Sequence, residues 1–141
     1  MRRSLLIALS ALVLAGCGSV STTVAVSQWR TEAHFDANTT TLVHDVRRAA
    51  EQLKDPASTV DTRRTVCAIL LLDAQAANSA LPTPDDQATT LLGRAYDDFG
   101  AGANRCYAAR GAGYESLALA SLRSGMASLS EGRARLDAAA R

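Results

Sequence analysis

The spacing of apolar side chains constrains the fold of this 141-residue chain more than any other feature. Over most of the chain these side chains recur at intervals of three, four or seven residues, which is the period of an amphipathic helix. One such stripe consists of Phe35, Leu42, Val46, Ala49 and Leu53. No stretch shows the strict alternation of apolar and polar residues that is typical of a half-buried strand. The pattern predicts an all-α protein.

Turn and capping residues divide the pattern into four helices. The first is expected over about residues 27–53, and the second begins near Ser58. A cap at Thr83 followed by Pro84 predicts the start of the third helix, because proline is well tolerated in a first helical turn. The break at Gly111-Ala112-Gly113 separates the third helix from the last. We expect a four-helix antiparallel bundle, up-down-up-down, with short loops and one interhelix disulfide.

The first seventeen residues have the organisation of an export signal. Arg2 and Arg3 precede an apolar run from Leu5 to Leu14, which is about 15 Å long as a helix, roughly half of the ~30 Å hydrocarbon core. The run is therefore too short to span a membrane. A basic start, a short apolar core and small residues at its end are typical of a secretory signal.

The end of this stretch, Leu14-Ala15-Gly16-Cys17, resembles the lipobox of bacterial lipoproteins. The resemblance covers only these first residues, and it implies cleavage after Gly16 and attachment of diacylglycerol to the Cys17 thiol. Two acyl chains hold a protein durably on a membrane, so the expected location is the outer, extracytoplasmic face of the cell membrane. The alternatives are an ordinary secretory signal with an incidental cysteine, and an uncleaved anchor.

This interpretation divides the chain into three parts. Residues 1–16 are the signal peptide that is removed, residues 17–27 are the lipidated cysteine and a flexible tether, and residues 28–141 are the helical-bundle domain. Loss of Arg2 and Arg3 leaves 13 of the 15 basic side chains against all 14 acidic ones. Because a near-neutral domain lacks the basic surface that nucleic acid requires, we expect no nucleic-acid partner. The preference for arginine over lysine suggests a high-GC bacterium such as an actinobacterium.

With Cys17 committed to lipid, Cys67 and Cys106 remain as an even pair in an exported protein, which favours a disulfide between them. The bond would close a loop of about 40 residues and contribute ~4 kcal/mol through the entropy of the unfolded chain. Two buried free thiols or a redox pair are the alternatives.

Ideal antiparallel helices would leave Cys67 and Cys106 out of level by ~13 Å. Either an extended linker over residues 79–83 or a distorted third helix can remove this offset. Glycine weakens a helix interior, so we expect the distortion near Gly100 and Gly102.

No set of residues in the sequence predicts catalysis. His34 and His44 are ten residues apart on one expected helix, ~15 Å along its axis, and cannot bind one metal ion together. Asp85-Asp86 fits helix capping, and Asp97-Asp98 fits a solvated face. The sequence has no Gly-x-Ser-x-Gly motif and no glycine-rich phosphate loop after a strand. We therefore expect no enzyme, with no catalytic residue, metal or cofactor.

A strip of small residues marks the last helix, where Ala118, Gly125, Gly132 and Ala139 recur every seven residues. Such a strip lets another helix approach closely. It predicts either a contact within the chain or a groove in which a partner helix or an acyl chain docks.

These observations predict a lipid-anchored extracytoplasmic helical bundle that acts as a non-enzymatic interaction or structural module of the cell envelope. Its expected contacts are the membrane, through the diacylglyceryl anchor, and an envelope protein. The alternative is a carrier or sensor of an apolar ligand held between the helices, which needs an apolar pocket of a few hundred Å³. Arg47-Arg48 and Arg63-Arg64 are expected on solvated faces, with a headgroup or an anionic polymer as the alternative contact.

Overall fold

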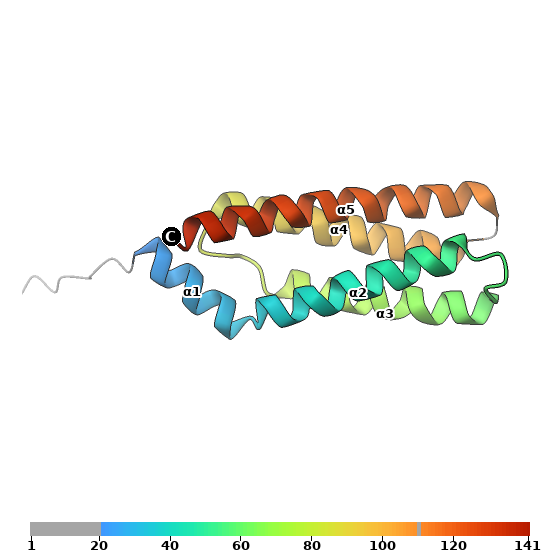
Figure 1. The fold of residues 1–141 in the computed structure, drawn as a ribbon, viewed down its shortest axis with the longest axis horizontal. Helices are drawn as coiled ribbons and strands as arrows, with labels where there is room; N and C mark the ends of the chain where they lie inside the picture. The colour runs from blue at the N-terminus through green and yellow to red at the C-terminus, as the bar shows by residue number, and fades with distance from the viewer. Residues whose placement is uncertain (1–20, 110) are drawn as a thin grey trace, which may run out of the picture.

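The computed structural model of the protein describes residues 21–109 and 111–141. Within these ranges the chain is all-helical, without a strand, and Figure 1 shows its five helices. They are α1 (Thr22–Glu32), α2 (Phe35–Lys54), α3 (Val60–Ser79), α4 (Asp86–Ala108) and α5 (Ala112–Ala139). Helices α2 to α5 run in alternating directions, and α1 lies at the end of the bundle where α2 begins and α5 ends. The predicted all-α class is confirmed, but the predicted number of four helices is wrong.

The additional helix results from a break at His34, inside the helix that was predicted over residues 27–53. His34 has φ 48° and ψ 36°, in the left-handed region that residues other than glycine seldom adopt. The helix therefore stops, and α2 begins anew at Phe35. The Asn38 side chain donates a hydrogen bond to the Ala33 carbonyl at 2.9 Å, which satisfies one of the groups that the break releases.

Tertiary contacts hold α1 at an angle to α2. The Trp29 ring lies 5.3 Å from the Phe35 ring, and the Trp29 indole N–H donates a hydrogen bond at 3.0 Å to the Ala80 carbonyl, directly after α3. Val26 is completely buried. A straight helix through His34 would carry these side chains away from the bundle, so the break allows α1 to cover its end.

Part of the segment that was predicted to be a flexible tether is helical. Helix α1 begins at Thr22, with the Ser21 side chain accepting a hydrogen bond from the Val24 amide at 3.4 Å. Residues 22–27, which were assigned to the tether, are therefore helical. The signal peptide, the lipobox and the lipidated Cys17 lie outside the described residues.

The predicted disulfide is confirmed, because Cys67 of α3 and Cys106 of α4 are bonded, with their Cα atoms 5.9 Å apart. The distortion expected near Gly100 is absent, since α4 is one continuous helix from Asp86 to Ala108. Instead, the connection over residues 80–85 runs on beyond the end of α3, so α4 starts further along the bundle (Figure 1). The connection, and not the helix, brings the two cysteines level.

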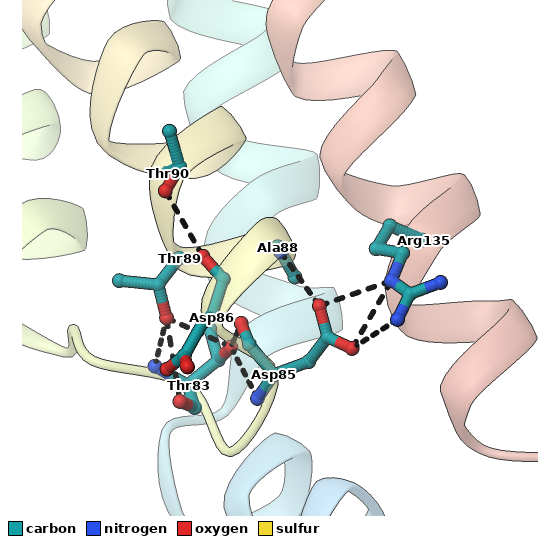
Figure 2. Close-up of polar contacts among 7 residues, drawn as sticks. All are labelled: Thr83, Asp85, Asp86, Ala88, Thr89, Thr90 and Arg135. Carbon is teal, nitrogen blue, oxygen red and sulfur yellow. Dashed lines mark hydrogen bonds and ion pairs between the residues drawn. The ribbon is translucent and has the colours of Figure 1, made fainter.

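The start of α4 depends on Asp85 and its neighbours, shown in Figure 2. The Asp85 carboxylate accepts a hydrogen bond from the Ala88 amide at 2.8 Å, and this interaction caps the helix. The Thr83 hydroxyl donates to the Asp85 carbonyl at 2.7 Å and accepts from the Asp85 amide at 3.1 Å. The start of this helix was predicted two residues too early: the cap is Asp85 and not Thr83, so Pro84 remains outside the helix.

Candidate functional site

An apolar groove of about 270 Å³ lies between α2 and α5, which run antiparallel in Figure 1. Its floor consists of Val46 and Ala50 from α2 and Leu119, Leu122 and Met126 from α5. The spacings of three and four residues place each set on one side of its helix. Val46 and Leu122 are only 4% and 2% exposed and belong to the core, whereas the other three are half-buried and line the open part.

Three cationic side chains border this groove: Arg47 and Lys54 from α2, and Arg123 from α5. All three are exposed, and within residues 21–109 and 111–141 none of them forms an ion pair. The exposed acids Glu51 and Glu131 lie on the same two helices but do not line the groove. The surroundings therefore suit a molecule that has an apolar part and a negative charge.

The groove continues into a more polar hollow of about 390 Å³, with Arg47 and Met126 lining both parts. Arg133 of α5 lines this second part, and it too has no ion pair among the described residues. Asp137 is the one acid in the lining, and its carboxylate lies 2.6 Å from the Arg30 guanidinium. Arg30 is shared with Asp36, at 2.7 Å, so it compensates Asp137 only in part. The hollow keeps a positive balance because Arg47 and Arg133 in its lining outnumber Asp137.

The polar cluster at the start of α4 has a structural role. The Arg135 guanidinium contacts both oxygens of the buried Asp85 carboxylate, at 2.7 Å for the shortest pair (Figure 2). The hydrogen bond from Arg135, followed by the one from the Ala88 amide, lowers the pKa of Asp85. The oxygens of Asp85 are used by partners within the chain, so this carboxylate caps a helix and connects α4 to α5.

Two acidic residues, Asp45 of α2 and Asp73 of α3, lie next to each other where these helices pack together. Burial, and then the adjacent Asp45 carboxylate, raise the pKa of Asp73. Asp45 is also 3.3 Å from the His44 imidazole and 3.6 Å from the Arg48 guanidinium. His34 is at the break between α1 and α2, outside the helix that carries Asp45. No three His, Cys, Asp or Glu side chains in the described ranges are grouped so that they could hold a metal ion.

The strip of small residues on α5 is covered by α4. A Cβ atom on Gly125 would lie 2.6 Å from the Phe99 ring, and one on Gly132 would lie 2.8 Å from a methyl group of Leu92. Ala118 is completely buried. Ala139, at the end of the strip, is half-buried and packs against the core. The strip is a contact within the chain, so it is not open to a partner helix or an acyl chain.

The groove could not be identified from the sequence. Val46 and Leu122 belong to the two apolar stripes from which helices were predicted, and Arg47 was expected on a solvated face. The available signal was a cation beside each stripe, at Arg47 and Arg123. It could not be used because the sequence does not specify which two helices face each other.

Comparison of the chain with protein-family models, curated proteins and solved structures finds no match. Among the helices of residues 21–109 and 111–141, none combines the length and apolar character needed to cross a membrane. The longest, α5, carries charged residues such as Arg123, Glu131 and Arg133.

Proposed function

We propose that this protein is a lipid-anchored module on the outer face of the cell membrane that binds another molecule of the cell envelope and catalyses no reaction. Cys17 would carry the lipid, and the groove between α2 and α5 would be the binding site. The observation that carries the proposal is the combination of an apolar floor with cations that have no ion-pair partner in the described residues.

Two features of the groove support binding over a purely structural role. Half-buried side chains such as Leu119 and Met126 keep apolar surface in contact with water, and covering this surface is favourable. The side chains of Arg47 and Arg123 could pair with a negative charge without giving up a partner within the described chain. A bound molecule would therefore gain both contacts at little cost to the protein.

Methionine provides a direct test of the groove in living cells. The sequence has two methionines, Met1 and Met126, and Met1 leaves with the proposed signal peptide. Cells grown on photo-methionine would then carry one photoreactive side chain in the mature protein, in the groove. After irradiation we expect an adduct of defined mass on the peptide containing Met126, and we expect Arg47→Glu to reduce its yield.

The matched control moves the single methionine to another surface. In Met126→Leu/Leu72→Met the photoreactive group lies on α3, at a position that is 64% exposed and does not line the groove. Leu72 lines a separate hollow of about 310 Å³, so this variant should not give the adduct mass found at Met126, and its products should not respond to Arg47→Glu. The same products from both proteins, or an adduct that does not respond to Arg47→Glu, would contradict binding in the groove.

A further inference from the structure

We propose that the occupant of the α2/α5 groove is a fatty acid with a single acyl chain, its tail on the apolar floor and its carboxylate held by Arg47 and Arg133. This inference rests on the proposed function, since it names the class of molecule that the groove binds. It uses both parts of the groove and the position of Arg47, which lines the two parts where they meet.

The apolar part has the size of a site for one chain. Its volume of about 270 Å³ lies just below the range of ~300–1,000 Å³ that is usual for small-molecule pockets. A lipid with two chains would leave much of its apolar surface in water. The contacts available on Ala50, Leu119 and Met126 are aliphatic or thioether groups, which pack against a flexible chain without needing a fixed ring geometry.

The adjoining part suits a head with one negative charge. Arg47 and Arg133 both line it, and a guanidinium group matches the two oxygens of a carboxylate. Asp137 lies in the same lining, and because it shares the Arg30 guanidinium with Asp36, part of its negative charge remains uncompensated. A second negative charge on the head, as on a phosphomonoester, would lie near Asp137 and be repelled. We therefore assign a carboxylate to this position.

A partner helix is a poorer fit to the same surface. A stable protein interface covers about 800 Å² on each partner. Here Val46 and Leu122, which form the deepest part of the floor, are 4% and 2% exposed. The accessible apolar surface therefore comes mainly from Ala50, Leu119 and Met126. One acyl chain can cover three half-buried side chains, but they are too few for a stable interface with a helix.

The experiment uses the full chain in nanodiscs of zwitterionic phosphatidylcholine with a diazirine-bearing myristate as the probe. After irradiation, mass spectrometry locates the label, and its yield in the groove is compared with its yield elsewhere on the chain. We expect most of the label on peptides that contain Ala50 and Met126. Unlabelled myristate should displace it at a concentration at least tenfold lower than tetradecanol, which has the same chain without the charge.

Two pairs of variants test the positive charge of the groove and the space on its floor, and each pair includes a control for loss of folding. Arg47→Gln/Arg133→Gln should reduce labelling of the groove at least tenfold, whereas Arg94→Gln, at an exposed position on α4 outside the groove, should leave it unchanged. Ala50→Phe should block the floor, whereas Ala127→Phe, at an exposed position on α5 outside the lining, should not. Circular dichroism verifies the fold of each variant.

Three results in nanodiscs would each overturn the inference: label distributed evenly over the chain, equal competition by myristate and tetradecanol, or stronger competition by a lysophosphatidate than by myristate. A protein crosslinked at Met126 in cells, without any fatty-acid labelling in nanodiscs, would also overturn it. That last result would leave the proposed binding function standing, so the failure of one can be told from the failure of the other.

Discussion

Arg135, near the end of the chain, holds the carboxylate of Asp85 that caps α4. Its Nη2 lies 2.7 Å from Oδ2, and its Nε lies 3.0 and 3.1 Å from Oδ2 and Oδ1. Oδ1 also accepts the hydrogen bond from the Ala88 amide. One buried carboxylate thus joins the first turn of α4 to a helix 50 residues away in the sequence, and local capping and tertiary packing depend on the same atoms.

This arrangement predicts a response to acid. The pKa of Asp85 in the folded protein is below its ordinary value of 3.8, with the hydrogen bond from Arg135 as the largest cause. The stabilisation is therefore fully present above pH 3.8 and is lost as the pH falls through the lower folded value. Between about pH 5 and pH 2.5, the free energy of unfolding should fall less for Arg135→Gln than for the unmodified protein. Urea unfolding at each pH measures this difference. Parallel curves for the two proteins would contradict this coupling.

Asp73 should have the opposite dependence on pH. Its pKa is raised, first by burial and then by the adjacent Asp45 carboxylate, so the folded protein binds this proton more tightly than the unfolded chain. Its contribution to the stability of the folded protein is most favourable below pH 3.8, and it is lost as the pH rises through the pKa of Asp73 in the folded protein. Asp73→Asn should therefore stabilise the protein at pH 7, with the gain disappearing in acid. Asp97→Asn, at an exposed position on α4, is the control and should change stability by less than about 0.5 kcal/mol.

Two glycines that occupy helix interiors should respond differently to alanine. At Gly125 the new Cβ would lie 2.6 Å from the Phe99 ring and 3.0 Å from the Ala95 carbonyl oxygen. Gly125→Ala should therefore destabilise the protein by about 1–3 kcal/mol. At Gly100 the nearest atom is a Leu71 methyl group at 3.9 Å, so Gly100→Ala should stabilise by up to ~1 kcal/mol through helix propensity. Thermal unfolding of both variants tests the contrast. A stabilised Gly125→Ala variant would show that α4 and α5 can move apart at little cost in free energy.

The disulfide should contribute a large part of the stability of the domain. Cys67 and Cys106 are 39 residues apart, and closing a loop of this length removes ~4 kcal/mol of unfolded-chain entropy. Reduction should lower the melting temperature by about 10–20 °C for a domain of this size. The double variant Cys67→Ala/Cys106→Ala should melt at the lower temperature with and without reductant. If reductant still lowered the melting temperature of this variant, the effect could not come from the disulfide.

The anchor is tested separately from the fold. Changing Cys17 to Ala should leave an unprocessed precursor without a lipid label, because the thiol is the proposed attachment atom. Metabolic labelling with a radioactive fatty acid, followed by membrane fractionation, gives the result. Met126→Leu is a suitable control, since it changes the groove and leaves the lipobox intact. Lipid label on the Cys17→Ala protein would exclude attachment at this residue.

The all-α class and most of the helix ends could be read from the sequence because their causes are local. Apolar residues three and four apart lie on one side of a helix in any fold. The polar residues that precede α4, with Asp85 among them, favour the start of a helix because their side chains accept hydrogen bonds from free amides of the first turn. The pairing of Cys67 with Cys106 followed from their even number together with the expected export, once Cys17 was set aside.

Tertiary structure decided the rest. The left-handed conformation of His34 is unfavourable by itself, and it persists because Val26 is completely buried and the Trp29 indole is hydrogen-bonded to Ala80, 51 residues away in the sequence. Gly125 and Gly132 could have faced water, a partner or a neighbouring helix, and only the packing of Phe99 and Leu92 shows that they face α4. The groove exists because α2 and α5 meet across the bundle, which brings Arg47 and Arg123 to one site. Periodicity shows which side of a helix is apolar, but contacts between distant segments determine what that side meets.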